Sequence, residues 1–154
     1  MSADTNTDRI ERSIDIKASR ARVWRALADT RQFGNWFGVK LPDGAFVPGE
    51  PVRGNITCPG YEHLVFEVQV DRVEPEKLLS FHWHPYAIEA GADYSHETPT
   101  LVTFTLEDSE QGTRLTVVES GFDKLPAERR QEAFRMNSQG WDAQMDNIAR
   151  HVGG

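Results

Sequence analysis

A strand and the longest helix of the chain are joined by the stretch Leu115-Thr116-Val117-Val118-Glu119-Ser120-Gly121-Phe122. Its first half alternates between core-type and surface-type positions, which is typical of a half-buried β-strand. The alternation places Glu119 on the same face as Leu115 and Val117, where an apolar residue is expected. We therefore predict an acidic group on the inner face of a sheet.

The segment after Gly121 carries apolar residues at helical spacing. Pro126 suits the first turn of this helix, because its missing N–H would have no partner there. The core-facing stripe follows 4-3-4-3-4 spacing and consists of Phe134, Ser138, Trp141, Met145, Ile148 and Val152. A helix of about 26 residues is about 39 Å long, enough to cross a whole curved sheet. An inward acid beneath such a helix indicates a container with a polar group inside.

Length and composition limit the class of protein. The 154 residues fit a disordered tail over 1–8 and one domain over 9–152. The net charge of −7, with no basic cluster, disfavours nucleic acid and anionic membranes as partners. No apolar run approaches the roughly 20 residues that cross a bilayer. Cys58 is the one cysteine, and Met1–Asp8 lacks a signal-peptide pattern, so we expect a cytoplasmic protein.

The other elements are predicted from periodicity and turn residues. Arg9–Ala18 alternates as a first strand, and two short helices follow, capped by Ser19 and Thr30. Gly38–Pro51 is predicted as a loop and Pro85–Pro99 as a flap or rim. Further strands are predicted at Val52–Cys58, Glu62–Val73, Lys77–Tyr86, Thr100–Glu107 and Thr113–Ser120. This order indicates an α+β fold with one antiparallel sheet of about six strands.

Strand parity then assigns side chains to the two faces of the sheet. Val117 is paired with Phe104 in the last hairpin, which keeps Glu119 on the inner face. If the first strand pairs with the last so that Ile14 meets Val117, Arg12 falls opposite Glu119. We therefore predict a cross-strand ion pair between Arg12 and Glu119 on the concave face. Both a structural role and a ligand-anchoring role stay open for this pair.

The same parity gives a set of candidate ligand-contacting residues. Placing Phe66 opposite both Trp83 and Ile56 also turns Cys58 inward. Aromatic residues and methionine at these positions either pack as core or line a cavity, and both interpretations stay open. The candidate ligand-binding residues are Arg12, Phe66, Phe81, Trp83, Phe104, Glu119, Trp141 and Met145.

The strand histidines argue against chemistry inside the container. His63, His82 and His84 fall on the convex face, with His82 across from Glu67. Their strand spacing is weak as a zinc motif. A phosphate loop, a Ser-His-Asp order and a paired-carboxylate motif are also missing from the sequence. We therefore predict no catalytic residue, no metal ligand set and no cofactor.

Several segments together resemble a known family. They are Ile10-Glu11-Arg12 to Ile16, Val23-Trp24-Arg25-Ala26-Leu27 with Trp36-Phe37, Asp93-Tyr94-Ser95 before Thr100-Leu101-Val102-Thr103-Phe104, Glu119-Ser120-Gly121-Phe122, and Gly140-Trp141. The chain resembles the START-like (SRPBCC) superfamily and, more narrowly, bacterial single-domain homologues of the activator of the heat-shock-protein-90 ATPase. The resemblance implies a helix-grip fold, in which a curved antiparallel sheet wraps around the C-terminal helix and leaves a hydrophobic cavity between the sheet and the helix.

Three functions follow from the residues and the resemblance. The first is a protein that binds an apolar or amphipathic small molecule. The second is a co-chaperone-like interaction module that contacts a chaperone, although the separate N-terminal domain of the eukaryotic activators has no counterpart here. The third is a polyketide-cyclase-like enzyme with Glu119 as its base, which a neighbouring Arg12 would weaken. We rank them in this order and expect a monomer, or a homodimer formed through the outer sheet.

Overall fold

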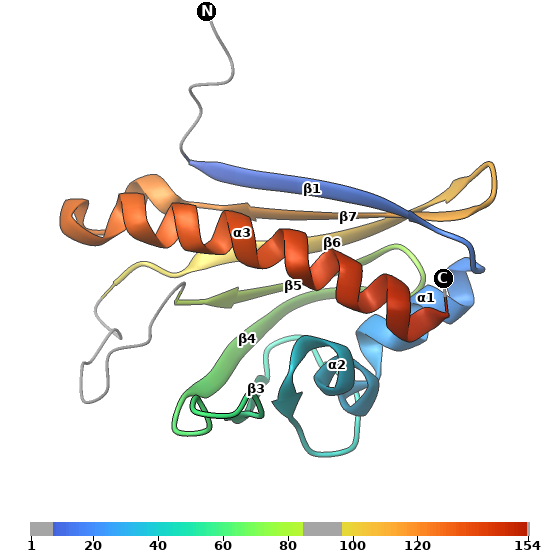
Figure 1. The fold of residues 1–154 in the computed structure, drawn as a ribbon, viewed down its shortest axis with the longest axis horizontal. Coiled ribbons are helices and arrows are strands. Elements are labelled where there is room, and N and C mark those ends of the chain that lie inside the picture. Colours follow the sequence, from blue (N-terminus) through green and yellow to red (C-terminus); the bar gives the residue numbers. More distant parts are fainter. Residues whose placement is uncertain (1–7, 85–96, 154) are drawn as a thin grey trace, which may run out of the picture.

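One antiparallel sheet, ordered β1-β7-β6-β5-β4-β3-β2, forms the framework of residues 8–84 and 97–153, which the computed structural model describes (Figure 1). The strands are β1 (Arg9–Ile16), β2 (Val39–Lys40), β3 (Pro51–Ile56), β4 (Val65–Glu74), β5 (Leu78–Trp83), β6 (Thr100–Ser109) and β7 (Gly112–Ser120). The helices are α1 (Arg20–Ala28), α2 (Thr30–Phe37), the 3-10 turn η2 (Phe122–Lys124) and α3 (Ala127–Val152). The predicted α+β class is confirmed, and the two-residue β2 lies within the segment predicted as a loop.

The long C-terminal helix lies along the inner face of the sheet (Figure 1). It begins after Pro126 and runs for 26 residues. It ends where Gly153 adopts the left-handed conformation, with φ of 100°. Its buried residues are Ala133, Trp141, Met145, Ile148 and Val152. Most of the predicted apolar stripe therefore faces the core, as the helical spacing indicates.

The two short helices, α1 and α2, cover one end of the space between the sheet and α3 (Figure 1). Ser19 caps α1 as predicted, since its side chain accepts a hydrogen bond from the Arg22 N–H. The cap of α2 is Asp29 and not Thr30, because the Asp29 carboxylate accepts from two backbone N–H groups. Thr30 is buried instead, and its hydroxyl donates to the Pro42 carbonyl at 2.6 Å.

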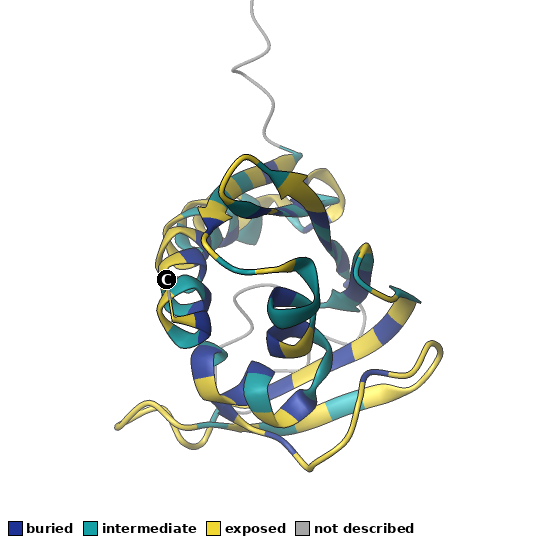
Figure 2. Ribbon diagram, turned by 90° about the vertical axis from the view of Figure 1, so that its right-hand side faces the viewer, coloured by how far each residue is buried: buried dark blue, intermediate teal, exposed yellow. Residues whose placement is uncertain are grey.

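Buried and exposed residues alternate along the strands, as Figure 2 shows for the sheet seen from its side. In β6, Thr100, Val102, Phe104 and Leu106 are buried while the residues between them are not. The last hairpin has the predicted register, with Phe104 opposite Val117. The inner face of the sheet is therefore the one that parity assigned.

The pairing of β1 with β7 differs from the prediction by two residues. Ile10, and not Arg12, is the partner of Glu119, while Arg12 is opposite Val117. A shift of two keeps every side chain on its face, so the faces are right and the partners are wrong. The predicted Arg12–Glu119 ion pair is therefore not formed.

Both ends of β1 explain this register. The backbone N–H groups of Gly121 and Phe122 donate to the Asp8 carbonyl at 3.0 and 3.1 Å. At the other end, a Cβ on Gly112 would lie 2.2 Å from the Ile16 carbonyl oxygen. Only glycine therefore lets the two backbones approach there, and this contact sets Ile16 against the start of β7.

The middle strands are also shifted by two residues from the predicted pairs. Phe66 lies opposite Gly54 in β3, and Val70 lies opposite Phe81 in β5. An irregularity between Val70 and Arg72 adds one more residue to this displacement on the side of the turn, where Arg72 lies opposite Ser80. The shift also places His82 opposite a glutamine and not opposite the predicted Glu67.

The predicted position of Cys58 is wrong, and the predicted tail and flap lie almost entirely outside the described residues. Cys58 is exposed beyond the end of β3, so its predicted inward position is wrong. Residues 1–7 and 85–96 lie outside the described part of the chain, and with them all of the predicted tail except Asp8 and most of the predicted flap. Among the described helices, none is both long enough and apolar enough to span a membrane.

Candidate ligand-binding site

Glu119 is the centre of a buried hydrogen-bond network beneath α3. Glu119 is fully buried, with an exposed fraction of 0%. The indole N–H of Trp83 and the hydroxyl of Thr100 donate to Oε2 at 2.7 and 2.6 Å. The indole N–H of Trp141 and the amide N–H of Asn137 donate to Oε1, each at 2.9 Å. One carboxylate therefore ties β7 to β5, β6 and α3.

Four donors replace the counter-charge that a buried carboxylate normally needs. No ion pair to Glu119 is present in the described part of the chain. A carboxylate offers about four lone-pair sites, two on each oxygen. Each oxygen of Glu119 accepts two hydrogen bonds, so the network uses all of them. Glu119 therefore stabilises the packing of its neighbours and keeps no site for accepting a substrate proton.

Arg12 bonds to the helix above it and not to Glu119. Its Nε donates to Oδ1 of Asp142 on α3 at 2.7 Å. The Arg12 side chain is 36% exposed and that of Asp142 is 63% exposed. An ion pair this open to water contributes little to stability, at most about 1 kcal/mol. Arg12 therefore joins β1 to α3 at the rim and is not among the residues lining the pocket.

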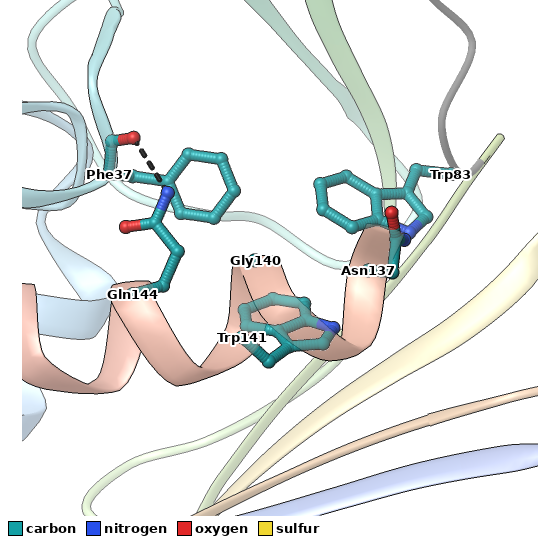
Figure 3. Close-up of a pocket in the computed structure, with 6 residues that line it drawn as sticks. All are labelled: Phe37, Trp83, Asn137, Gly140, Trp141 and Gln144. Atoms are coloured by element: carbon teal, nitrogen blue, oxygen red, sulfur yellow. Dashed lines mark hydrogen bonds between the residues drawn. The ribbon is translucent and has the colours of Figure 1, made fainter. Parts of the chain in front are cut away.

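A pocket of about 90 Å³ lies beside the Glu119 network, between α2, the end of β5 and α3. Figure 3 shows Phe37 on one side of this space, Trp83 and Asn137 on the other, and the turn of α3 that carries Gly140 beneath. Its lining residues are Phe37, Trp83, Asn137, Gly140, Trp141 and Gln144. Trp83, Asn137 and Trp141 belong both to the pocket wall and to the Glu119 network.

Three aromatic rings form the apolar wall of the pocket. The Trp83 and Trp141 rings are nearly stacked, with centroids 5.8 Å apart and an interplanar angle of 29°. The Phe37 ring lies 6.0 Å from Trp83 and 6.2 Å from Trp141. Phe66 packs behind Phe37 at 5.3 Å, so the wall continues into the aromatic core. The wall is therefore held by packing as well as by Glu119.

Gly140 is a glycine in the middle of α3 that no steric contact requires. A Cβ built on it meets nothing within 4 Å, in contrast to Gly112. Glycine inside a helix costs roughly 0.5–1 kcal/mol relative to alanine. The residue is exposed and lines the pocket. The missing side chain therefore leaves the helix backbone open to the pocket.

The polar groups of the wall have assigned orientations. Asn137 must turn its NH₂ toward Glu119, because a carboxylate only accepts, so its oxygen is the end left over. Gln144 donates to the Phe37 carbonyl at 3.0 Å and accepts from Asn147 at 3.1 Å. Gln144 therefore joins α3 to the end of α2, while Asn137 retains an acceptor.

Two of the eight predicted ligand-binding residues, Trp83 and Trp141, line this pocket. Glu119 lies one hydrogen bond behind it. The predicted residues buried away from this pocket are Phe66, Phe81, Phe104 and Met145. A ligand contact by these four, or by Arg12, stays a prediction.

Four lining residues were missed by the sequence interpretation: Phe37, Asn137, Gly140 and Gln144. Asn137 precedes Trp141 by one helical turn and Gln144 follows it by one, so helical spacing contained a signal for both. Gly140 is also unusual as a glycine within a helical pattern. Phe37 had no such signal, because its approach to α3 depends on how α2 is packed.

Metal-ligating side chains do not gather elsewhere in the described ranges. No group of three or more histidine, cysteine, aspartate or glutamate residues could hold an ion there.

The described part of the chain also contains a bidentate ion pair, in which Arg129 donates to both oxygens of Glu97 at 2.7 and 2.9 Å. This pair joins α3 to the residues before β6.

A curved antiparallel sheet that holds a long C-terminal helix, with a pocket between them, defines a START-like protein of the helix-grip class. Residues 17–153 match the family model described as Activator of Hsp90 ATPase homolog 1-like protein, and the chain belongs to this family. The resemblance found in the sequence is thus confirmed. No curated protein matches the chain.

Solved structures share the fold. A Mesorhizobium loti protein is 23% identical with a TM-score of 0.73, over 94% of this chain and 96% of that one. An Arthrobacter aurescens protein is 21% identical with a TM-score of 0.78, over 98% and 89% of the two chains. DynU16, a protein of the dynemicin biosynthetic locus, is 25% identical with a TM-score of 0.72. The match covers 94% of this chain but only 47% of DynU16.

Proposed function

We propose that this protein binds a small apolar or amphipathic molecule, which enters the pocket between α2, β5 and α3. The observation that carries the proposal is Gly140, a helical glycine that packing does not require and that opens the α3 backbone to an aromatic pocket. A residue that lowers helix stability without a packing reason is expected at a functional site. The START-like fold supports the same function.

The volume of the pocket limits what it accepts. Pockets for drug-sized ligands measure roughly 300–1,000 Å³, whereas this pocket measures about 90 Å³. We therefore propose that it takes one compact end of a ligand, while the remainder stays outside the wall. The aromatic rings supply apolar contact and Asn137 supplies one hydrogen-bond acceptor.

Binding is favoured over catalysis by the state of Glu119. A general base must accept a proton from its substrate within hydrogen-bond reach. Glu119 is covered and accepts four hydrogen bonds, which occupy both of its oxygens. It is therefore suited to holding the pocket wall, and the enzymatic alternative loses the base on which it depended.

The experiment blocks the pocket and asks whether captured ligand disappears. Gly140→Leu introduces a side chain that lies over the turn containing Asn137, because helical side chains point toward the N-terminus. Ala143→Leu places the same side chain at an exposed position of α3 that does not line the pocket. Both substitutions introduce leucine, a good helix former.

Native mass spectrometry of the protein purified from its own host is the measurement. We expect a bound small molecule on the wild type and on Ala143→Leu, and its loss from Gly140→Leu. Equal retention by both variants would refute this pocket as the site. The co-chaperone alternative makes a different prediction. If the Gly140→Leu protein increases the ATPase rate of the host chaperone, the function depends on a surface other than this pocket.

A further inference from the structure

We propose that the compact end bound by the pocket is a positively charged methylated ammonium group, as in a choline-like molecule. This inference rests on the proposed function, since it names the chemical class that the pocket takes. Its basis is the combination of three aromatic rings, a buried negative charge that is hydrogen-bonded to two of them, and a wall without cationic side chains among the six described lining residues.

The aromatic wall suits a cation. The faces of tryptophan and phenylalanine rings carry negative electrostatic potential, and a cation within about 6 Å of a ring centroid is attracted to it. Trp83, Trp141 and Phe37 all line the same small space. Rings arranged around one space are the known means of binding quaternary ammonium groups. Methyl groups on the nitrogen also match apolar walls.

Glu119 strengthens the attraction for a cation. Both indole N–H groups of the wall donate to its carboxylate, at 2.7 and 2.9 Å. Donation to an anion polarises the donor, which makes the indole faces more electron-rich. The carboxylate has no counter-charge within ion-pair distance among the described residues. Its field therefore reaches the pocket through a wall one side chain thick.

The same features disfavour anionic ligands. A carboxylate or phosphate group would need several donors, but both indole N–H groups are occupied by Glu119, and Asn137 and Gln144 each already donate one of their two amide N–H groups. None of the six described lining residues is charged. The oxygen of Asn137, which Figure 3 shows beside Trp83, is an acceptor and suits the hydroxyl of a choline-like ligand. Charge and hydrogen bonding therefore select the same class.

An isosteric pair of probes separates charge from shape. Choline and 3,3-dimethylbutan-1-ol differ by the replacement of the quaternary nitrogen with carbon. Isothermal titration of the wild type should give tighter binding of choline by roughly 5- to 30-fold, which corresponds to about 1–2 kcal/mol of cation–π attraction. Equal affinity, or a preference for the alcohol, would overturn this inference and leave the proposed function standing.

A variant pair assigns the charge preference to the ring wall. Phe37→Leu keeps an apolar side chain but removes one aromatic face, and it should reduce the preference for choline without abolishing binding of the alcohol. Phe134→Leu is the matched control, since Phe134 packs on Phe122 away from the pocket. An unchanged preference in Phe37→Leu would overturn the inference. If neither probe binds the wild type, the inference is also wrong. The proposed function is then tested separately by native mass spectrometry of the protein purified from its host.

Discussion

Glu119 is a buried charge satisfied by hydrogen bonds rather than by an ion pair. Desolvation of an isolated carboxylate is costly, and the four donors from Trp83, Thr100, Asn137 and Trp141 offset that cost. Two of the donors are indole N–H groups whose rings form the pocket wall. A single acid therefore determines both the stability of the inner face and the position of the candidate site.

Glu119→Gln is expected to destabilise the protein by about 2–5 kcal/mol. The amide NH₂ replaces an acceptor oxygen and meets two donors, which are left unpaired in the core. Urea denaturation measures the change in the free energy of unfolding. Glu107→Gln at an exposed position of β6 is the control and should change it by no more than about 0.5 kcal/mol. Equal effects of the two substitutions would contradict the network.

Gly140→Ala is expected to raise the free energy of unfolding by about 0.5–1 kcal/mol. The new methyl group meets no atom within 4 Å and improves helix propensity. Gly112→Ala provides the contrast, because its Cβ would meet the Ile16 carbonyl at 2.2 Å. Thermal denaturation of both variants checks the pair. A loss of stability in Gly140→Ala would show that α3 needs glycine for packing.

The inward face of Glu119 followed from the sequence, whereas its partners did not. Alternation along β7 is a local pattern and needs no knowledge of neighbouring strands. The Arg12 partner required the register of β1, which depends on Gly112 and on backbone contacts of Asp8. The Asn137 and Trp141 donors required the rotation of α3 over the sheet. Local periodicity determines neither the register of β1 nor the rotation of α3.

At the scale of elements, the errors in strand pairing are small shifts along the strands. β1 against β7 and β3 against β4 are displaced by two residues from the pattern-based pairing, and β4 against β5 by two residues up to Val70 and by three beyond it. A two-residue shift leaves the apolar pattern unchanged, so hydrophobicity alone cannot choose between the registers. Turn geometry and the irregularity after Val70 make that choice. By contrast, the extent of α3 follows from caps and spacing within its own segment.

The C-terminal end of α3 is expected to make stability depend on pH. Burial and, to a smaller degree, the charge of Arg22 lower the pKa of His151 in the folded protein. The folded state therefore disfavours the protonated ring, and its stabilising contribution is present above the ordinary histidine value of about 6.5. This contribution is lost as the pH falls through the lowered pKa.

His151→Gln tests this dependence through the difference in the free energy of unfolding between wild type and variant. The wild type should lose stability relative to the variant as the pH falls from about 8 to about 5. Urea titrations at several pH values measure the difference. A difference that does not change with pH, or that grows in favour of the wild type in acid, would contradict the stated shift.

For the whole molecule, the pocket depends on the assembly of three elements that are distant in sequence. α2 contributes Phe37, β5 contributes Trp83, and α3 contributes the rest of the described wall. The fold class was predictable because grouped strands followed by one long helix leave few arrangements. The pocket was predictable only in its tryptophans, because its size and its acceptor arise from side-chain packing between those elements.

The most direct test of ligand binding at this pocket is an NMR titration of the tryptophan indole N–H signals. The chain contains four tryptophans, and Trp36 provides an internal control because its N–H donates to the Ala26 carbonyl in the core. A captured ligand should shift the Trp83 and Trp141 signals and leave that of Trp36 in place. A bound ligand that leaves Trp83 and Trp141 unmoved, or that moves Trp36 equally, would contradict the account.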